Sequence, residues 1–453
     1  MTKKKAQKGS ARKAKLTVRY DDALPTFTDL VAEHLGPKAL RRDCFLRDAD
    51  GNLTYIVRGE IAQAKRDALT SAVKAAMATY AGEFPIATPS ELFDDTLSDP
   101  KAGILEYVAT AAKPRFVRVV ERRIVGQDWI RGIWPAIGNV PPIVVFASHK
   151  GGVGRSTALA VAAAEFARRG LSILALDADL EAPGLGELFI PEDKQPLFGA
   201  IDYFVENGRG SVDGRFLDEM RAPSALTRGP GKVFVVPAVG RRCRQFPQNV
   251  IGKISRAYLE DVGEGGVERF TLLEQMRTMI RDLASRRHYD VIFVDARAGL
   301  NETTAATVQG LGADVLFFGI DTPQTWDGYR YFLAHLARFK PLGGVDDWRF
   351  RLKMVHAKAA PNEGSLAHFR DNAFEMFAEH LYDEEEETES GRSDVFGFDL
   401  DDPTGPHFGW PIFVDEGYYE FDPVADRSQL SPERYNASFG QFLKLLADRL
   451  GIK

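Results

Sequence analysis

The sequence has little cysteine and no long apolar run, and each absence limits what kind of protein it can encode. Cys44 and Cys243 are the only cysteines in 453 residues, too few for a disulfide framework or a cysteine-built metal site. No apolar stretch approaches the roughly 18 residues that span a bilayer, and the N-terminus lacks the apolar core of a secretory signal. We therefore expect a cytoplasmic protein without membrane insertion.

Histidine and net positive charge are also scarce. The eight histidines are scattered without the close spacing of metal ligands, so we expect no structural metal. The formal charge is −6 and the isoelectric point is near 5.9, which argues against coating of nucleic acid by the whole protein. With 44% hydrophobic and 27% charged residues, the chain is typical of a globular protein with two or three cores.

The basic residues that are present gather at the N-terminus. Residues 1–15 contain seven lysines and arginines and no acid, a composition that predicts a disordered tail. The tail is either a solvated segment without a binding role, or it contacts a polyanion. The polyanion would be nucleic acid or an anionic membrane surface. Nothing in its sequence selects between these interpretations.

Residues 16–124 predict a small α/β accessory domain. A strand is expected at 53–57, a helix at 61–80 and a second strand at 115–120. No catalytic motif lies in this region, so a docking or regulatory role is favoured. The stretch 125–142 is rich in tryptophan and proline and is interpreted as a connector.

After Pro142, short apolar runs alternate with helical periodicity. Buried strands are expected at 143–146, 171–176, 233–236, 291–294, 315–318 and 352–355, and helices at 155–169, 270–287, 302–310, 325–339, 368–380 and 432–450. This alternation predicts a doubly wound, mostly parallel sheet over 143–453. An insertion is expected at about 186–268, and a mobile acidic loop at about 383–405.

A glycine-rich turn follows the first of these strands. It reads Lys150-Gly151-Gly152-Val153-Gly154-Arg155-Ser156-Thr157 and leads into an alanine-rich helix. In such a turn the backbone N–H groups and the helix N-terminus converge on phosphate oxygens, and the serine is placed for Mg²⁺. The segment therefore predicts a P-loop that binds a nucleoside triphosphate with Mg²⁺.

At these residues the sequence resembles the ParA/MinD-type, or deviant Walker A, ATPases. Lys150 matches the extra early lysine of that family, Asp177-Ala178-Asp179 resembles the second-strand motif, and Val291 to Asp295 resembles a Walker B strand. The resemblance covers roughly residues 143–340. It implies an ATP-dependent homodimer in which the early lysine reaches the partner's phosphates, and it implies a dedicated protein partner.

Roles are expected for individual polar residues of this region. Ser156 is expected to bind Mg²⁺ directly, with Asp295 and Asp177 acting through water. Asp179 matches the position that orients the attacking water. Glu181 is interpreted either as a further member of the magnesium shell or as a surface residue.

The loop departs from the common pattern at one residue. Arg155 stands where most members have a second lysine, which resembles a variant subgroup that also carries a run like Asp179 to Leu185 here. Arginine keeps the charge but is longer and planar. We expect nucleotide binding to survive and hydrolysis to be slow, with Lys150 supplying the remaining ammonium.

Three further segments have two interpretations each. Arg297 either stabilises charge during phosphoryl transfer or pairs with a neighbouring acid, and the turn 295–302 matches the family's switch position. Residues 321–323 either contact the base or a partner, or cap a helix. The basic run 241–244 either contacts a partner or nucleic acid, or lies in a solvated loop.

The favoured function is a slowly hydrolysing ATPase whose nucleotide controls dimerisation and, through it, a partner protein or a DNA-linked process. One alternative is a nucleotide-binding regulatory module without turnover, motivated by Arg155. Another is an ATP-using metabolic transferase of the same fold, which fold analogy alone does not exclude.

Overall fold

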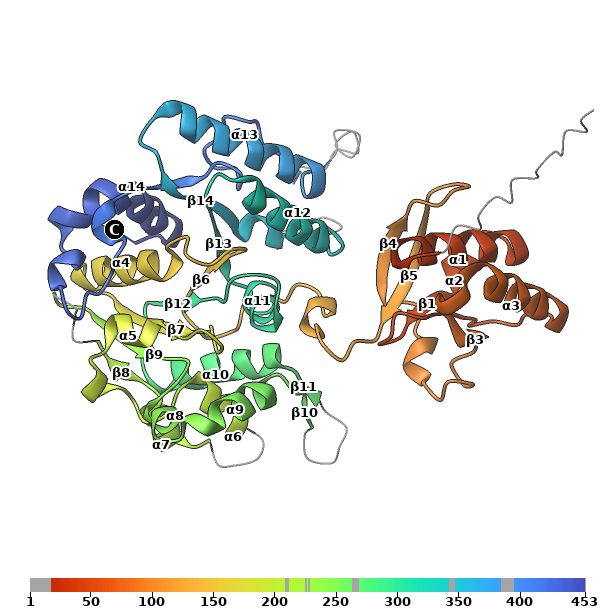
Figure 1. Cartoon of the computed structure of the whole chain (residues 1–453), viewed down its shortest axis with the longest axis horizontal. Helices are drawn as coiled ribbons and strands as arrows, with labels where there is room; N and C mark the ends of the chain where they lie inside the picture. Colours follow the sequence, from red (N-terminus) through yellow and green to blue (C-terminus); the bar gives the residue numbers. More distant parts are fainter. Residues whose placement is uncertain are drawn as a thin grey trace, which may run out of the picture. The chain divides into compact units, whose positions relative to one another are not determined.

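The chain forms two compact units that separate after Ile124 (Figure 1). The structure is a computed structural model, and it describes residues 18–207, 212–224, 226, 229–262, 269–341, 347–383 and 395–452. The predicted basic tail at 1–15 lies outside the described residues. Among the helices of the described ranges, none has the length and apolarity needed to cross a membrane.

The first unit is built on a five-stranded mixed sheet in the order β3-β2-β1-β5-β4. Its elements are α1 (Tyr20–Leu35), α2 (Ala39–Arg42), β1 (Cys44–Arg47), β2 (Leu53–Ile56), α3 (Gln63–Met77), β3 (Ala81–Ala87), β4 (Ile104–Val108) and β5 (Arg115–Glu121). Strand β5 runs parallel to β1 and antiparallel to β4, which is an edge strand. The predicted elements at 53–57, 61–80 and 115–120 correspond to β2, α3 and β5.

The two faces of this sheet are covered unequally. Helices α1 and α3 pack on one face, where Phe27 and Val31 lie in the same core as Phe45 and Val119. On the other face Leu97 packs on Cys44 in a much smaller core. The first unit therefore has one main core and a second face that is only partly covered.

The second unit contains an eight-stranded sheet in the order β15-β14-β13-β6-β12-β7-β9-β8. The strands are β6 (Ile143–Ser148), β7 (Ser172–Asp177), β8 (Ala222–Pro223), β9 (Lys232–Val236), β12 (Val291–Asp295), β13 (Asp314–Gly319), β14 (Leu352–Ala359) and β15 (Trp410–Phe413). Every neighbouring pair is parallel except β8 with β9. All six residues of the central β6 are buried, as a strand covered on both faces requires.

Helices cover both faces of this sheet (Figure 1). The helices of this unit are α4 (Arg155–Arg168), α5 (Leu185–Phe189), α6 (Ala200–Glu206), α7 (Gly214–Glu219), α8 (Arg241–Gln245), α9 (Val250–Ala257), α10 (Leu272–Arg286), α11 (Glu302–Val308), α12 (Pro323–Ala337), α13 (Glu363–His380) and α14 (Pro432–Leu450). Buried residues of α4 and α14 share one core, and those of α6, α10, α12 and α13 share the other. This arrangement confirms the predicted doubly wound α/β fold.

Residues 125–142 pack on the second unit. The ring of Trp129 lies edge-on to Phe332 at 5.6 Å between centroids, and the N–H of Trp134 donates to the carbonyl of Gln309 at 2.8 Å. The stretch interpreted as a connector therefore contributes to the core on the α10 and α12 side of the sheet.

Two parts of the second unit differ from the expected insertion and loop. Strand β9 falls inside the predicted insertion at 186–268, yet it pairs with β7 and extends the main sheet. The predicted mobile loop at 383–405 is packed at its described ends, and its residues 384–394 lie outside the described residues. Asp383 accepts hydrogen bonds from the buried Arg349, and Phe396 is fully buried, because long-range contacts hold both ends of the loop.

Candidate functional site

The glycine-rich loop joins the end of β6 to the beginning of α4. Gly152 and Gly154 have φ of +75° and +92°, a conformation that side chains rarely adopt. A Cβ atom at either position would meet no other atom within 4 Å, so the loop borders open space. The loop therefore has the shape of a cradle at the N-terminus of a helix, where backbone N–H groups and the helix dipole favour an anion.

The first residues of α4 face the end of β12. Ser156 Oγ donates to Asp295 Oδ2 at 2.5 Å, and Arg155 Nε lies 3.9 Å from Asp295 Oδ1. Burial raises the pKa of Asp295, while the Arg155 charge and the Ser156 hydrogen bond oppose that shift. Two buried polar atoms, Asp295 Oδ1 and Arg155 Nη1, have no hydrogen-bond partner among the described residues. Such orphaned charged atoms beside an open cradle fit a ligand with complementary polar groups.

Asp177 lies in register with Asp295 on the adjacent strand. Its carboxylate accepts the N–H groups of Asp179, Gly184 and Leu185 at 3.0 to 3.2 Å. Burial, followed by the nearby charge of Asp295, raises the pKa of Asp177 to about 7. Asp177 thus holds the turn after β7 against the sheet.

Asp179 lies in that turn and is only partly buried. Its Oδ1 accepts the N–H of Ala182 at 3.0 Å and lies 3.9 Å from Arg297 Nε. Burial raises the pKa of Asp179, and the hydrogen bond and nearby guanidinium groups oppose that shift. Arg297 also forms an ion pair with Glu181. Arg297 therefore pairs with neighbouring acids in this structure, and its role in phosphoryl transfer stays a prediction.

Lys150 extends away from these acids. Its exposed Nζ donates to Gln324 Oε1 at the beginning of α12, at 2.8 Å. The preceding His149 packs closely on Gly328, where any Cβ would collide with the imidazole ring. The structure therefore gathers Arg155, Ser156 and the predicted aspartates at one edge of the sheet and leaves the Lys150 ammonium outside that group.

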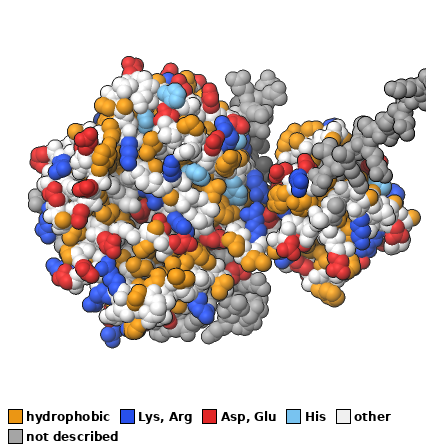
Figure 2. All heavy atoms as spheres, viewed as in Figure 1, with side chains coloured by type: hydrophobic (Ala, Val, Ile, Leu, Met, Phe, Trp, Pro, Cys, Tyr) orange, Lys and Arg blue, Asp and Glu red, His pale blue; other side chains and the backbone are white. Residues whose placement is uncertain are grey.

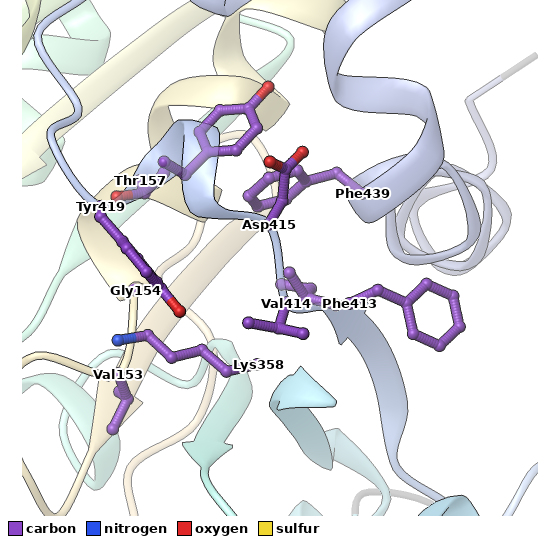
Figure 3. A pocket seen from close by; sticks show the side chains of 11 residues that line it. Val153, Gly154, Thr157, Lys358, Phe413, Val414, Asp415, Tyr419 and Phe439 are labelled. Atoms are coloured by element: carbon purple, nitrogen blue, oxygen red, sulfur yellow. The ribbon is translucent and has the colours of Figure 1, made fainter. Parts of the chain in front are cut away.

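A small cavity of about 50 Å³ lies beside the loop (Figure 3). It is lined by Val153, Gly154, Thr157, Lys358, Ile412, Phe413, Val414, Asp415, Tyr418, Tyr419 and Phe439. Lys358 ends near the loop with its side chain pointing toward Val153, and Tyr419 lies on the same side (Figure 3). Lys358 has φ of +54°, an unusual conformation for a residue with a side chain.

The glycine-rich motif identifies Val153, Gly154 and Thr157, but no sequence signal identifies the other residues that line this cavity. Those residues come from β14, from β15 and the segment after it, and from α14, and no local motif connects these segments. The positive φ of Lys358 is a feature that points to this cavity, and it is visible only in the structure.

Two segments with open interpretations have structural roles. Thr322 is the N-cap residue of α12 with Pro323 following it, and Asp321 accepts from Trp326 Nε1 at 2.9 Å. In the basic run 241–244, Arg244 pairs with Glu187 and Glu192 on the surface. Neither segment reaches the glycine-rich loop by a described contact.

Known proteins resemble parts of this chain. No family profile matches it. It is 28% identical over 149 residues to the cytosolic Fe-S cluster assembly factor CFD1 of Yarrowia lipolytica, which covers 32% of this chain and 49% of that protein. It is 38% identical over 100 residues to an iron-sulfur cluster carrier protein of Pseudomonas fragi, which covers 21% of this chain and 34% of that protein. The chain thus spans about half or less of these relatives' length.

Two solved structures align with the larger part of the chain. A ParA family ATPase from Chlorobium tepidum TLS is 16% identical, with 68% of this chain and 98% of that chain covered and a TM-score of 0.40. The ATP complex of Cyanothece McdA is 15% identical, with 70% and 98% covered and a TM-score of 0.40.

The class of the second unit follows from its own geometry. A buried central strand, a glycine-rich cradle, a helix with Ser156 in its first turn and Asp295 on the adjacent strand define a P-loop NTPase domain. Within that class, the motifs at Lys150 and Asp177 resemble those of the ParA/MinD-type ATPases.

Proposed function

We propose that this chain binds ATP with Mg²⁺ at the glycine-rich loop, hydrolyses it slowly, and uses the bound nucleotide as a dimerisation switch that controls a partner protein or a DNA-linked process. The observation that carries the proposal is the contact of Ser156 with Asp295 beside an open glycine cradle. The partner is inferred from the presence of a separate first unit without a catalytic motif.

The cradle supports phosphate binding. The backbone N–H groups of residues 151–156 would hold the phosphate oxygens, because this loop leads directly into the N-terminus of α4. The unpartnered Nη1 of Arg155 would donate to one of these oxygens, which would relieve a buried and unsatisfied donor.

The acids support metal binding. Ser156 would hold Mg²⁺ directly, and Asp295 and Asp177 would do so through water, consistent with oxygen ligands that retain part of the hydration shell. When bound, Mg²⁺ neutralises phosphate charge during transfer. Asp179 would orient the attacking water, and its position 3.9 Å from Arg297 Nε would fix its carboxylate at the turn.

The cavity beside Thr157 supports binding of the base. Its walls combine Ile412 and Phe439 with the polar groups of Lys358 and Asp415, and its volume of about 50 Å³ would admit one edge of a heteroaromatic ring. One Asp415 oxygen accepts from Ser438 and the other from the N–H of Gly417, so the carboxylate is held in place.

Lys150 supports the dimer. Its ammonium is exposed and forms one described hydrogen bond, to the neutral side chain of Gln324. Breaking that bond would cost little, since a neutral hydrogen bond at the surface contributes only about 1 kcal/mol. Lys150 is therefore free to contact phosphates bound to a second copy, and in that role it and Arg155 supply the positive charge of the site.

Light scattering tests the switch. Wild type is expected to double in mass with ATP and a non-hydrolysable analogue but not with ADP, and Lys150→Ala is expected to stay monomeric. Lys194→Ala is the matched control because Lys194 is also exposed and lies in a short 3₁₀ helix outside the loop. If the molar mass of wild type does not change on addition of ATP, the result would contradict the switch.

Nucleotide binding is measured separately by calorimetry. Ser156→Ala is expected to weaken Mg-ATP by about 10-fold or more, while metal-free ATP binds as in wild type. An equal loss with and without Mg²⁺ would contradict the role of Ser156 as a metal ligand.

Single-turnover hydrolysis separates a slow ATPase from a binding module without turnover. Wild type is expected to release phosphate slowly, Arg155→Lys faster, and Asp179→Ala not measurably. Equal and negligible rates in wild type and Asp179→Ala would leave nucleotide binding without turnover as the function.

We do not propose an iron-sulfur cluster role like those of the two relatives. The chain's two cysteines are Cys44 in the first unit and Cys243 in the second, and both are buried.

A further inference from the structure

The β4–β5 hairpin of the first unit exposes two aromatic rings side by side. Tyr107 and Phe116 are cross-strand neighbours, and their rings lie 5.2 Å apart at 62°. Their exposed fractions are 62% and 60%, and the nearby Leu105 is 50% exposed. Figure 2 shows hydrophobic side chains gathered on this side of the first unit, where Figure 1 places β4 and β5.

The exposure is confined to one part of one face. On the opposite face of β5, Val117 and Val119 are buried in the core that contains α1. On the same face as the rings, the sheet over β1 and β2 is covered by Leu97. Large apolar side chains left uncovered as a group, beside strands that are otherwise covered, are typical of a binding surface.

The sequence that contains the hairpin is richer in basic residues than the rest of the first unit. Residues 100–124 contain six lysines and arginines and two acids. Residues 18–99 contain nine lysines and arginines and fourteen acids. One of the two acids, Glu121, is already engaged by Arg47 and Arg123 at 2.7 and 2.8 Å. Within the hairpin itself, residues 104–121 contain three basic residues and two acids, and Lys101 adds a further cation just before β4.

Three of these cations are close to the hairpin's ends. Arg118 lies on the same face as the rings, and its Nη1 donates to the carbonyls of Lys101 and Gly103. Lys101 and Lys113 are exposed, and no described ion pair involves their ammonium groups. Two aromatic rings flanked by such cations match the chemistry of a polynucleotide with unpaired bases, whose bases stack while its phosphates contact the cations.

We propose that the β4–β5 face binds single-stranded nucleic acid, with bases stacked on Tyr107 and Phe116 and phosphates near Lys101 and Lys113. A duplex would not present its base faces to the rings, and an acidic peptide would use the cations without needing the rings. The proposed contacts involve bases and phosphates and not the sugar, so DNA and RNA strands are expected to bind alike. The proposal does not depend on ATP.

Fluorescence anisotropy of the full chain tests the site. Labelled oligothymidylate and oligouridylate of about 15 nucleotides are expected to bind better than a duplex of equal length, and more weakly at about 200 mM than at about 50 mM salt. Tyr107→Ala and Phe116→Ala are each expected to weaken single-strand binding by about 5-fold or more. Tyr107→Phe is expected to retain binding because it keeps a ring.

Phe84→Ala is the matched control, since Phe84 is also 62% exposed but lies on β3, at the other edge of the sheet. Lys113→Ala is expected to reduce the salt dependence, and Lys74→Ala on α3 is not. Circular dichroism checks that each variant is folded. Equal single-strand affinities of Tyr107→Ala and Phe84→Ala would overturn the proposal, and binding by the N-terminal tail alone would give that result. Tighter binding of the duplex would also overturn it.

Discussion

The two sheets of this protein place their candidate sites differently. In the second unit, β6 is buried along its whole length, and the candidate residues lie beyond the carboxyl ends of parallel strands. In the first unit, β5 alternates between buried and more exposed residues, and the candidate residues lie on an open sheet face. The comparison indicates that a sheet covered on both faces leaves its strand ends for ligands, whereas a half-covered sheet can use its face.

The largest expected difference between the two sheets is in stability. Phe146 is fully buried between Phe293 and Phe318, at 5.3 and 5.8 Å between ring centroids. Phe146→Ala is expected to lower the free energy of unfolding of the second unit by about 3–5 kcal/mol because it leaves a cavity. Urea unfolding followed by tryptophan fluorescence measures this, since all five tryptophans lie after residue 124.

The matched change in the first unit is Phe116→Ala. Because that ring is 60% exposed, its removal is expected to change the stability of the first unit by no more than about 0.5 kcal/mol, measured by hydrogen exchange of the β5 amides. A comparable loss in both variants would contradict the comparison between the sheets.

A second difference is expected in the response to pH. Lys353 on β14 is 3% exposed, and its Nζ donates to the carbonyls of Pro403 and Gly405 at 3.1 and 2.6 Å. Burial lowers the pKa of Lys353 to about 7, below the value of 10.5 for a free lysine. Above pH 7 the folded chain therefore binds fewer protons than the unfolded chain, and stability rises with pH.

The expected rise in the free energy of unfolding is at most about 1.4 kcal/mol per pH unit between pH 7 and 10. Tryptophan-detected unfolding at several pH values measures the slope, and Lys353→Met is expected to reduce it. The described lysines of the first unit are all exposed, so Lys74→Met is expected to leave the slope unchanged. An identical slope in Lys353→Met would show that other groups cause the pH dependence.

The smallest expected effect concerns a surface ion pair of the first unit. Arg66 donates two hydrogen bonds to Glu91 at 2.9 and 2.8 Å, and these bonds contribute most to lowering the pKa of Glu91 to about 2. Because both side chains are partly exposed, Glu91→Gln is expected to destabilise the first unit by only about 0.2–1 kcal/mol. Hydrogen exchange of the α3 amides measures this change, and a larger loss would mean that solvent screens the pair less than its exposure indicates.

Much of the second unit was predictable because its signals are local. Six expected strands lie at β6, β7, β9, β12, β13 and β14, since buried parallel strands are continuous apolar runs. The glycine spacing and Ser156 identify the loop, because only a tight turn into a helix needs those residues together. Their assigned roles in binding and catalysis stay predictions.

Other features depend on contacts that no short segment encodes. Strand β15 has four residues and follows the acidic segment, so its apolar run is too short to identify it. Helix α1 contains Pro25, which weakens the helical pattern. The packed ends of the 383–405 segment depend on Arg349, more than 30 residues away from Asp383. The lining of the cavity comes from three distant segments, and Lys358 carries no sequence signal of its backbone conformation.

The division of the chain after Ile124 has a consequence for valency. A monomer carries one β4–β5 face, whereas an ATP-bound dimer would carry two on separate units. A dimer whose two faces contact the same nucleic-acid molecule would bind it with avidity. Once the first face is bound, the effective concentration of the nucleic acid at the second face is raised. A slow nucleotide cycle would then set the residence time of the protein on the nucleic acid, without any change in the affinity of an individual face.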